Sequence, residues 1–209
     1  MQKTEYLSPD WNSLQTSHGD HLPHWQCERA VYHVSFRLAD SVPESRKYAW
    51  LVERQNILDN IAYLNRDPTD QERERLQHLY SEKIEKYLDA GHGECLLARP
   101  KAGRIVADAL EFFIGQRYYL HVYCVMPNHV HVLLEPVHDH DLRQIVHSWT
   151  SYTATRINQA LGRNGQLWQH DPYDHIVRSE KEYLFQLDYI WRNPGNMKTG
   201  YIRKRFDQS

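Results

Sequence analysis

The sequence has few of the features that mark fibrous, disordered or membrane proteins. Only nine of its 209 residues are glycine and nine are proline, which excludes a collagen-like or Pro/Gly-rich disordered chain. No stretch approaches the roughly 18 consecutive apolar residues of a membrane-spanning helix, and the first residues lack the apolar core of a signal peptide. We therefore expect a soluble, cytoplasmic protein with no membrane partner.

Cysteine is also scarce. Cys27, Cys95 and Cys124 are the three cysteines of the chain, and no pair of them has the C-x-x-C spacing. An odd number of cysteines without that spacing favours neither a disulfide framework nor a cysteine zinc site.

The chain has no excess of positive charge, since 25 Lys and Arg residues face 27 Asp and Glu residues for a net charge of −2. With a pI near 6.7, the protein is not one that coats nucleic acid through overall charge. The basic residues are concentrated toward the C-terminal end, which leaves room for a local basic groove. Histidine and tryptophan are abundant, at fourteen and six residues, so metal binding and base stacking become candidate chemistries.

Apolar periodicity predicts one domain over residues 1–209. Residues 1–25 are polar without periodicity, which predicts an irregular arm. Residues 31–38 are rich in β-branched and aromatic side chains and predict a first strand. Apolar residues at helical spacing among charges of both signs predict a charged helical hairpin, inserted at 44–90. An amphipathic stripe then predicts a helix over 102–115.

The second half of the chain predicts two more strands and then a helix–strand–helix sequence. Residues 118–125 and 129–135 form the expected hairpin, joined by a tight turn. A long helix is expected over 141–161 with Asp141 as its N-cap, then a short strand over 173–178. A last helix is expected from about Ser179 to Asn193, where Pro194 stops it, and 196–209 form a basic tail.

Without the insertion and the last helix, the order of elements is βαββαβ. This is the ferredoxin-like pattern, in which an antiparallel sheet carries two helices. The sequence therefore predicts an α+β fold with a helical-hairpin insertion after the first strand and a C-terminal helix.

A pair of histidines lies in the strand that follows the tight turn. The two-residue period of a strand puts His129 and His131 on one face, with Val130 and Val132 on the other. Two neighbouring imidazoles on a rigid strand can chelate one divalent ion. The same H-x-H pattern also fits two histidines on a half-exposed strand face without a metal.

The last helix carries a tyrosine away from its expected core stripe. A helical wheel gathers Tyr189 and Asn193 on the face opposite that stripe, one turn apart. The expected stripe contains Tyr183, Leu184, Leu187, Ile190 and Trp191. Tyrosines are common at such amphipathic boundaries, so the Tyr–Asn pair alone does not define a site.

Several short segments together resemble the REP-associated tyrosine transposases. These belong to the IS200-like transposases, which use a single tyrosine and carry a His-U-His (HUH) motif, in which U is a hydrophobic residue. Their order and spacing carry the resemblance, with the histidine pair in the second strand of a hairpin and the tyrosine in the last helix. The segments are 22–25, 31–41, 126–131, 167–169, 173–178 and 188–194. The resemblance covers most of the chain outside 44–90.

The resemblance implies a metal-dependent, single-stranded DNA endonuclease and transesterase that acts in DNA transposition or repeat mobilisation. By position, His129 and His131 match the metal ligands, Asn193 matches a third, amide ligand, and Tyr189 matches the nucleophile. The implied cofactor is Mg²⁺ or Mn²⁺, and the implied intermediate is a 5′-phosphotyrosine. The implied partner is a hairpin of repetitive DNA with a flanking guide tetranucleotide, in the bacterial cytoplasm at the nucleoid.

Basic and aromatic residues of the second half are candidates for DNA contacts, because phosphates attract cations and bases stack on aromatic rings. For each of them, a solvated charge or a packed aromatic is an equally good interpretation. The candidates are Arg156, Arg163, Trp168, His175, Arg178, Arg203, Lys204 and Arg205.

Two functions of other classes compete with this prediction. One is a module that binds DNA hairpins without cutting them, although retention of His129, His131, Tyr189 and Asn193 together counts against it. The other is a metal-dependent hydrolase of a small molecule, for which Glu135 is the nearest acidic ligand. The oligomeric state stays open between a monomer and a homodimer.

Overall fold

The computed structural model describes most of the chain outside 46–86. The described residues are 6, 8–18, 23–43, 45, 56–57, 59–60, 63–64, 66, 69, 71, 87–137, 140–170, 172–195, 197 and 199–206. The chain divides into two compact units, one formed by Met1–Ala39 with Cys95–Ser209 and the other by Asp40–Glu94.

The larger unit is built on a five-stranded antiparallel sheet. Its strands are β3 (Tyr32–Arg37), β4 (Tyr118–Val125), β5 (His129–Pro136), β6 (Tyr173–Ile176) and β7 (Ile202–Arg205). They lie in the order β6-β3-β5-β4-β7, and every neighbouring pair is antiparallel. If β7 is left out, β3 is the first strand of this sheet along the chain, and it lies between β5 and β6. The second strand, β4, then lies at the edge. The predicted ferredoxin-like α+β fold is confirmed.

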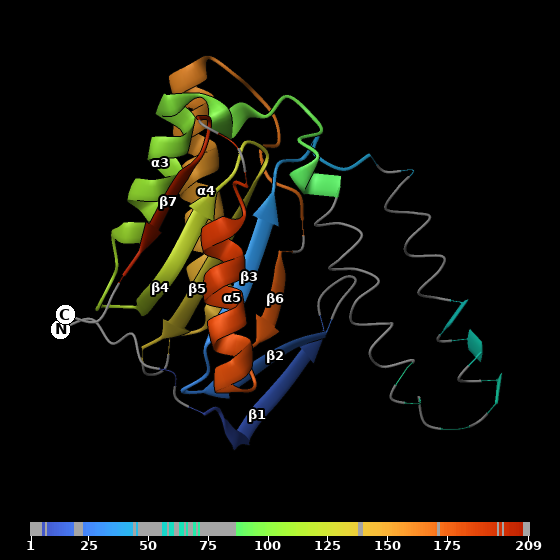
Figure 1. The fold of residues 1–209 in the computed structure, drawn as a ribbon. Helices are drawn as coiled ribbons and strands as arrows, with labels where there is room; N and C mark the ends of the chain where they lie inside the picture. The colour runs from blue at the N-terminus through green and yellow to red at the C-terminus, as the bar shows by residue number, and fades with distance from the viewer. Residues whose placement is uncertain are drawn as a thin grey trace. The chain divides into compact units, whose positions relative to one another are not determined.

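Helices cover both faces of this sheet (Figure 1). The helices α3 (Pro100–Glu111) and α4 (Leu142–Leu161) lie on one face. The helix α5 (Glu180–Arg192) lies on the other, and a short 3-10 helix, Leu96–Ala98, precedes α3. Asp141 caps α4 as predicted, since its carboxylate accepts hydrogen bonds from the backbone N–H groups of Arg143 and Gln144.

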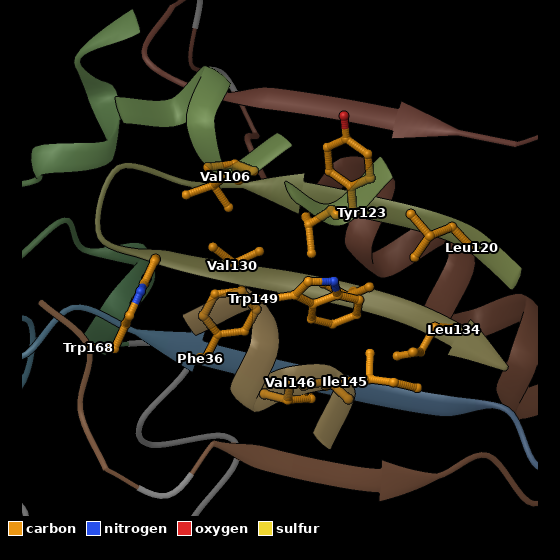
Figure 2. Packing of buried hydrophobic residues seen from close by; sticks show 14 of the residues in the cluster. Phe36, Val106, Leu120, Tyr123, Val130, Leu134, Ile145, Val146, Trp149 and Trp168 are labelled. Atoms are coloured by element: carbon orange, nitrogen blue, oxygen red, sulfur yellow. The ribbon is translucent and has the colours of Figure 1, made fainter. Parts of the chain in front are cut away.

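The main hydrophobic core lies between the sheet and the pair α3 and α4. Trp149 of α4 is buried between Tyr118 of β4, at 5.0 Å between ring centroids, and Phe36 of β3, at 6.5 Å. Figure 2 shows Trp149 over the sheet beside Phe36 and Val130. The Trp149 Nε1–H donates to the Tyr118 hydroxyl at 3.0 Å, so the polar edge of the indole is satisfied inside the core.

A smaller core on the opposite face fixes α5 to the sheet. Tyr183, Leu187 and Ile190 follow helical spacing and are buried against Val122 and Leu133 of the central strands. The predicted stripe is therefore correct for these three residues. It is wrong for Leu184, which is 55% exposed, because α5 contacts the sheet through a narrower face than the wheel suggests.

The predicted irregular arm is wrong over much of its length. The strands β1 (Asp10–His18) and β2 (Pro23–Glu28) pair in an antiparallel ladder with an irregularity between Asp10 and Gln15. The two apolar residues Trp11 and Leu14 of β1 are 44% and 40% exposed. The sequence of this hairpin therefore shows little of the apolar alternation that predicts a half-buried strand.

The predicted basic tail also contains a strand. Residues Ile202–Arg205 pair with Val122–Val125 as the edge strand β7. Three consecutive basic residues, Arg203 to Arg205, suit the edge of a sheet, where charge discourages pairing with another chain.

The predicted helical hairpin over 44–90 lies mostly outside the described residues. In the smaller unit, the described part includes a cluster of Val42 and Leu88 with Tyr87 packed against it. The backbone N–H of Glu94 donates to the Asp40 carboxylate at 2.7 Å. Among the residues that the structure describes, no helix has both the length and the apolar character needed to cross a bilayer.

Candidate active site

A row of buried polar side chains lies on the sheet face that α5 covers. On β3, alternation puts His33, Ser35 and Arg37 on this face, while Tyr32, Val34 and Phe36 point into the main core. The antiparallel register sets Ser35 opposite His131 and Arg37 opposite His129 on β5. Two adjacent strands thus contribute polar groups to one buried patch.

The histidine pair projects from one face of β5, as predicted. The imidazole centroids of His129 and His131 are 4.7 Å apart with the rings nearly perpendicular, and both residues are fully buried. A ligand nitrogen of one lies within 4.8 Å of a ligand nitrogen of the other. The two rings are therefore close enough for both to bind one ion.

Hydrogen bonds orient both imidazoles through their Nδ1 atoms. His129 Nδ1 lies 2.7 Å from the Oδ1 of Asn128 in the hairpin turn, and His131 Nδ1 lies 3.0 Å from the Nε2 of His33 on β3. Within the part of the chain that the structure describes, the buried His131 Nε2 has no hydrogen-bond partner. The nitrogens away from these contacts are the ones available to bind an ion.

The buried imidazoles are neutral at physiological pH. Burial lowers the pKa of His129 to about 3, with the positive charge of Arg37 as a second cause. Burial also holds the pKa values of His131 and His33 well below 6.5, with neighbouring histidines adding to the effect. Since a metal ligand must be deprotonated, these imidazoles are in the state that binds a cation.

Tyr189 of α5 lies against the histidine pair. Its ring centroid is 5.6 Å from that of His131 and 6.2 Å from that of His33, in edge-to-face arrangements. On its other side, the exposed Phe185 stacks on it, nearly parallel at 6.3 Å. The expectation that Tyr189 lies on the face opposite the core stripe is wrong, because the helix turns this side chain toward the sheet, where it is partly buried against the smaller core.

The start of α5 is fixed to β6 through Glu182. Ser179 caps the helix by accepting from the Glu182 N–H at 3.2 Å, and the Glu182 carboxylate accepts from the Arg178 N–H at 2.8 Å. The same carboxylate lies 2.6 Å from His175 Nε2 on β6. Since β6 pairs with β3, these contacts fix where α5, and with it Tyr189, lies over the sheet.

Asn193 directly follows α5, one helical turn beyond Tyr189. Its Oδ1 is buried. The structure thus brings His129, His131 and Tyr189 together, and Asn193 lies at the end of the helix that carries the tyrosine.

His33 and Asn128 were not predicted as site residues. A signal for His33 was present in the sequence, because polar residues at 33, 35 and 37 alternate with apolar ones in a strand expected to be buried. The contact between His33 and His131 depends on strand order and register, which a single strand does not reveal.

The prediction that Trp168 stacks on a DNA base is wrong. The residue is 6% exposed and packs edge-on against Phe36 at 4.9 Å between centroids, and its Nε1–H donates to Thr153 at 2.9 Å. Its ring is part of the main core, since residues 167–169 run beside the end of β3.

The remaining candidate DNA contacts are distributed over several elements. Arg156 on α4, Arg178 and Arg205 are exposed, and Arg163 is half-buried after α4. The other three side chains make internal contacts. His175 pairs with Glu182, Arg203 donates to the Trp191 carbonyl and lies over its ring, and Lys204 pairs with Glu111.

The region of the chain that contains this site is similar to a known protein family. Residues 109–192 match the family described as "Transposase IS200 like". This span includes His129, His131 and Tyr189 and ends one residue before Asn193. The predicted resemblance to IS200-like transposases is confirmed.

A candidate REP-associated tyrosine transposase of Haemophilus influenzae is 29% identical to the chain in an alignment of length 89 that covers 38% of this chain. The chain spans about half, 49%, of the length of that curated relative. Two solved structures are also similar to this chain. One is a REP-associated tyrosine transposase bound to a REP hairpin (17% identity, 82% of this chain and 72% of the other, TM-score 0.38). The second is a candidate transposase from Deinococcus radiodurans (16% identity, 78% and 89%, TM-score 0.33).

The two tyrosines of α5 that face the sheet are expected to differ when changed. Tyr183→Phe removes a hydroxyl that lies 2.9 Å from His121 Nδ1 in the smaller core, so we expect a loss of about 1–3 kcal/mol in the free energy of unfolding. Tyr189→Phe keeps the ring contacts and is expected to cost less than about 1 kcal/mol. Urea denaturation of both variants measures the free energy of unfolding. An equal loss in both would contradict the assignment of the Tyr183 hydroxyl, and not that of Tyr189, as the one that stabilises the smaller core.

Proposed function

We propose that this protein is a metal-dependent endonuclease and transesterase for single-stranded DNA, with Tyr189 as its nucleophile. The observation that carries the proposal is the packing of the Tyr189 ring against His131, one of two neutral imidazoles buried side by side. The match of residues 109–192 to IS200-like transposases supports it.

The donor set fits a divalent cation. His129 and His131 are neutral, their rings are oriented by Nδ1 contacts, and the buried His131 Nε2 makes no hydrogen bond among the described residues. We assign the amide oxygen of Asn193 as a third ligand. Two imidazoles and an amide leave coordination positions open, which suits Mg²⁺ or Mn²⁺. When bound, such an ion polarises a phosphate oxygen and orients the scissile bond.

Tyr189 carries out the covalent step. Its phenol oxygen forms a bond to phosphorus and loses its proton, while the bond from phosphorus to the 3′ oxygen breaks and that oxygen gains a proton. The products are a 5′-phosphotyrosine and a free 3′-hydroxyl. Because one phosphodiester replaces another, attack by a second 3′-hydroxyl reverses the step and joins strands without ATP.

We assign a DNA hairpin with a flanking guide tetranucleotide as the substrate. Both the hairpin and the tetranucleotide are what the family resemblance of the sequence implies, and a REP-associated tyrosine transposase that is similar to this chain was solved bound to a REP hairpin. A net charge of −2 gives little non-specific attraction to phosphate, so selectivity is expected to come from hairpin shape and a few adjacent bases. DNA transposition, or mobilisation of repeats in the bacterial cytoplasm, is the corresponding cellular role.

The position of Glu135 does not support the alternative of a metal-dependent hydrolase that acts on a small molecule. It shares the face of His131 but follows it by four residues, about 13 Å along a strand, too far to bind the same ion. It lies instead near Tyr183, whose pKa its charge helps to raise, after burial as the main cause. A module that binds DNA hairpins without cutting them is a second alternative.

Tyr189→Phe is expected to abolish formation of a covalent protein–DNA adduct. Only the nucleophilic oxygen is lost, so binding of the hairpin should stay within a few-fold of wild type. Labelled hairpin DNA, analysed on SDS gels, measures the adduct, and Tyr201→Phe is a matched control. An adduct in Tyr189→Phe would show that the nucleophile is another residue, and no adduct with the wild type would favour the non-cleaving module.

Cleavage is expected to stop when divalent ions are removed. His129→Ala or His131→Ala should lower the rate by several orders of magnitude, whereas Asn193→Ala should cost less because water can replace an amide ligand. Rates with EDTA and after addition of Mg²⁺ or Mn²⁺ test this, and undiminished cleavage in excess EDTA would contradict a role for metal.

Hairpin-forming single strands are expected to be cleaved much faster than the annealed duplex. The scissile phosphate must reach Tyr189 and the histidine pair, and opening a stacked duplex costs about 1.4 kcal/mol per base-pair step. The measurement compares one strand, its complement and the duplex at equal concentration. Equal rates on all three would indicate a general nuclease.

A further inference from the structure

His33 is a buried histidine of β3 to which the proposed reaction assigns no step. It is 3% exposed and lies on a strand with neighbours on both sides, β5 and β6. Its ring contacts His131 at 5.2 Å, Tyr189 at 6.2 Å and Tyr173 at 6.4 Å between centroids. One side chain therefore contacts both a proposed metal ligand and the proposed nucleophile.

We propose that His33 is a positioning residue, which accepts the Nδ1–H of His131 and so holds the bare Nε2 of His131 toward the metal ion. This inference rests on the proposed function, because it assigns His131 as a ligand. Its basis is the 3.0 Å contact between His33 Nε2 and His131 Nδ1.

The direction of this hydrogen bond determines whether His131 can bind metal. A neutral imidazole carries one N–H and one bare nitrogen. If His33 donated to Nδ1, the proton of His131 would lie on Nε2, and that nitrogen could not be a ligand. If His33 accepts, Nε2 has a lone pair, and its burial without a hydrogen-bond partner among the described residues fits this state.

His129, the other proposed histidine ligand, has the same kind of contact at its Nδ1, and there the acceptor is an amide oxygen. His129 Nδ1 lies 2.7 Å from the Asn128 Oδ1, an amide oxygen that can only accept, so its Nε2 is the bare nitrogen. Asn128 holds His129 from the adjacent position of its own chain segment. His33 would hold His131 from the neighbouring strand, as a diagonal cross-strand neighbour, since Ser35 is the residue opposite His131.

The contact with Tyr189 couples this arrangement to the nucleophile. The ring planes of His33 and Tyr189 meet at 67°, so the His33 ring forms part of the surface on which Tyr189 rests. The ring of Tyr173 packs on His33 at 81°, and this contact restricts rotation of His33. A change at His33 is therefore expected to disturb the His131 ring before it disturbs the fold.

Binding of Mn²⁺ to the DNA-free protein tests the proposal without measuring activity. His33→Leu fills the space of the imidazole with an apolar side chain that cannot accept a hydrogen bond. Loss of a hydrogen-bond partner of a metal ligand typically weakens metal binding 10- to 100-fold. His33→Gln can place an amide oxygen near the position of Nε2, so we expect affinity within a few-fold of wild type. The free Mn²⁺ signal in electron paramagnetic resonance gives the affinities.

The matched control is His121→Leu, the same substitution at another buried histidine, which contacts Tyr183. It is expected to lose stability and keep its Mn²⁺ affinity. The proposal is overturned if His33→Leu is folded by circular dichroism and binds Mn²⁺ as the wild type does. It is also overturned if His33→Gln is folded and loses as much affinity as His33→Leu.

The tautomer of His131 tests the proposal in the wild-type protein, whether or not the variants fold. We expect nitrogen NMR of metal-free protein to show the His131 proton on Nδ1, and a proton on Nε2 would overturn the proposal. The expected tautomer together with an absence of DNA cleavage would contradict the proposed function and leave the role of His33 in orienting His131 intact.

Discussion

The site depends on the burial of two neutral imidazoles side by side on β5. Burial keeps the pKa of His129 near 3 and that of His131 well below its usual range, so both rings remain uncharged and able to bind a cation. The cost of burying polar rings is offset by hydrogen bonds at their Nδ1 atoms to Asn128 and His33. These contacts fix ring orientation before any ion binds, a form of preorganisation.

The placement of α5 depends on contacts away from the histidine pair. Tyr183, Leu187 and Ile190 fix the helix to the sheet, and Glu182 connects its first turn to His175 on β6. The helix then carries Tyr189 to the pair, where it rests on the rings of His131 and His33. The proposed ligands and nucleophile therefore lie on strands and a packed helix and not on loops, which favours a precise site.

Local periodicity was sufficient to predict the ferredoxin-like order, the Asp141 cap and the shared face of His129 and His131, because each depends on residues near in sequence. It failed where tertiary contacts decide. The β1–β2 hairpin and β7 lie in polar segments, where a strand leaves only a weak hydrophobic pattern in the sequence. Trp168 is indistinguishable in sequence from an exposed aromatic, and the contact between His33 and His131 requires the register of β3 on β5. The roles of Tyr189 and Asn193 came from family resemblance, since a Tyr–Asn pair on a helix does not identify a nucleophile.

Anomalous diffraction from crystals of the protein soaked in Mn²⁺ is the most direct test of whether the histidine pair binds a metal ion beside Tyr189. We expect an anomalous peak within coordination distance of the Nε2 atoms of both His129 and His131, on the side of Tyr189. A Mn²⁺ peak bound elsewhere, with none at the histidine pair, would contradict this expectation.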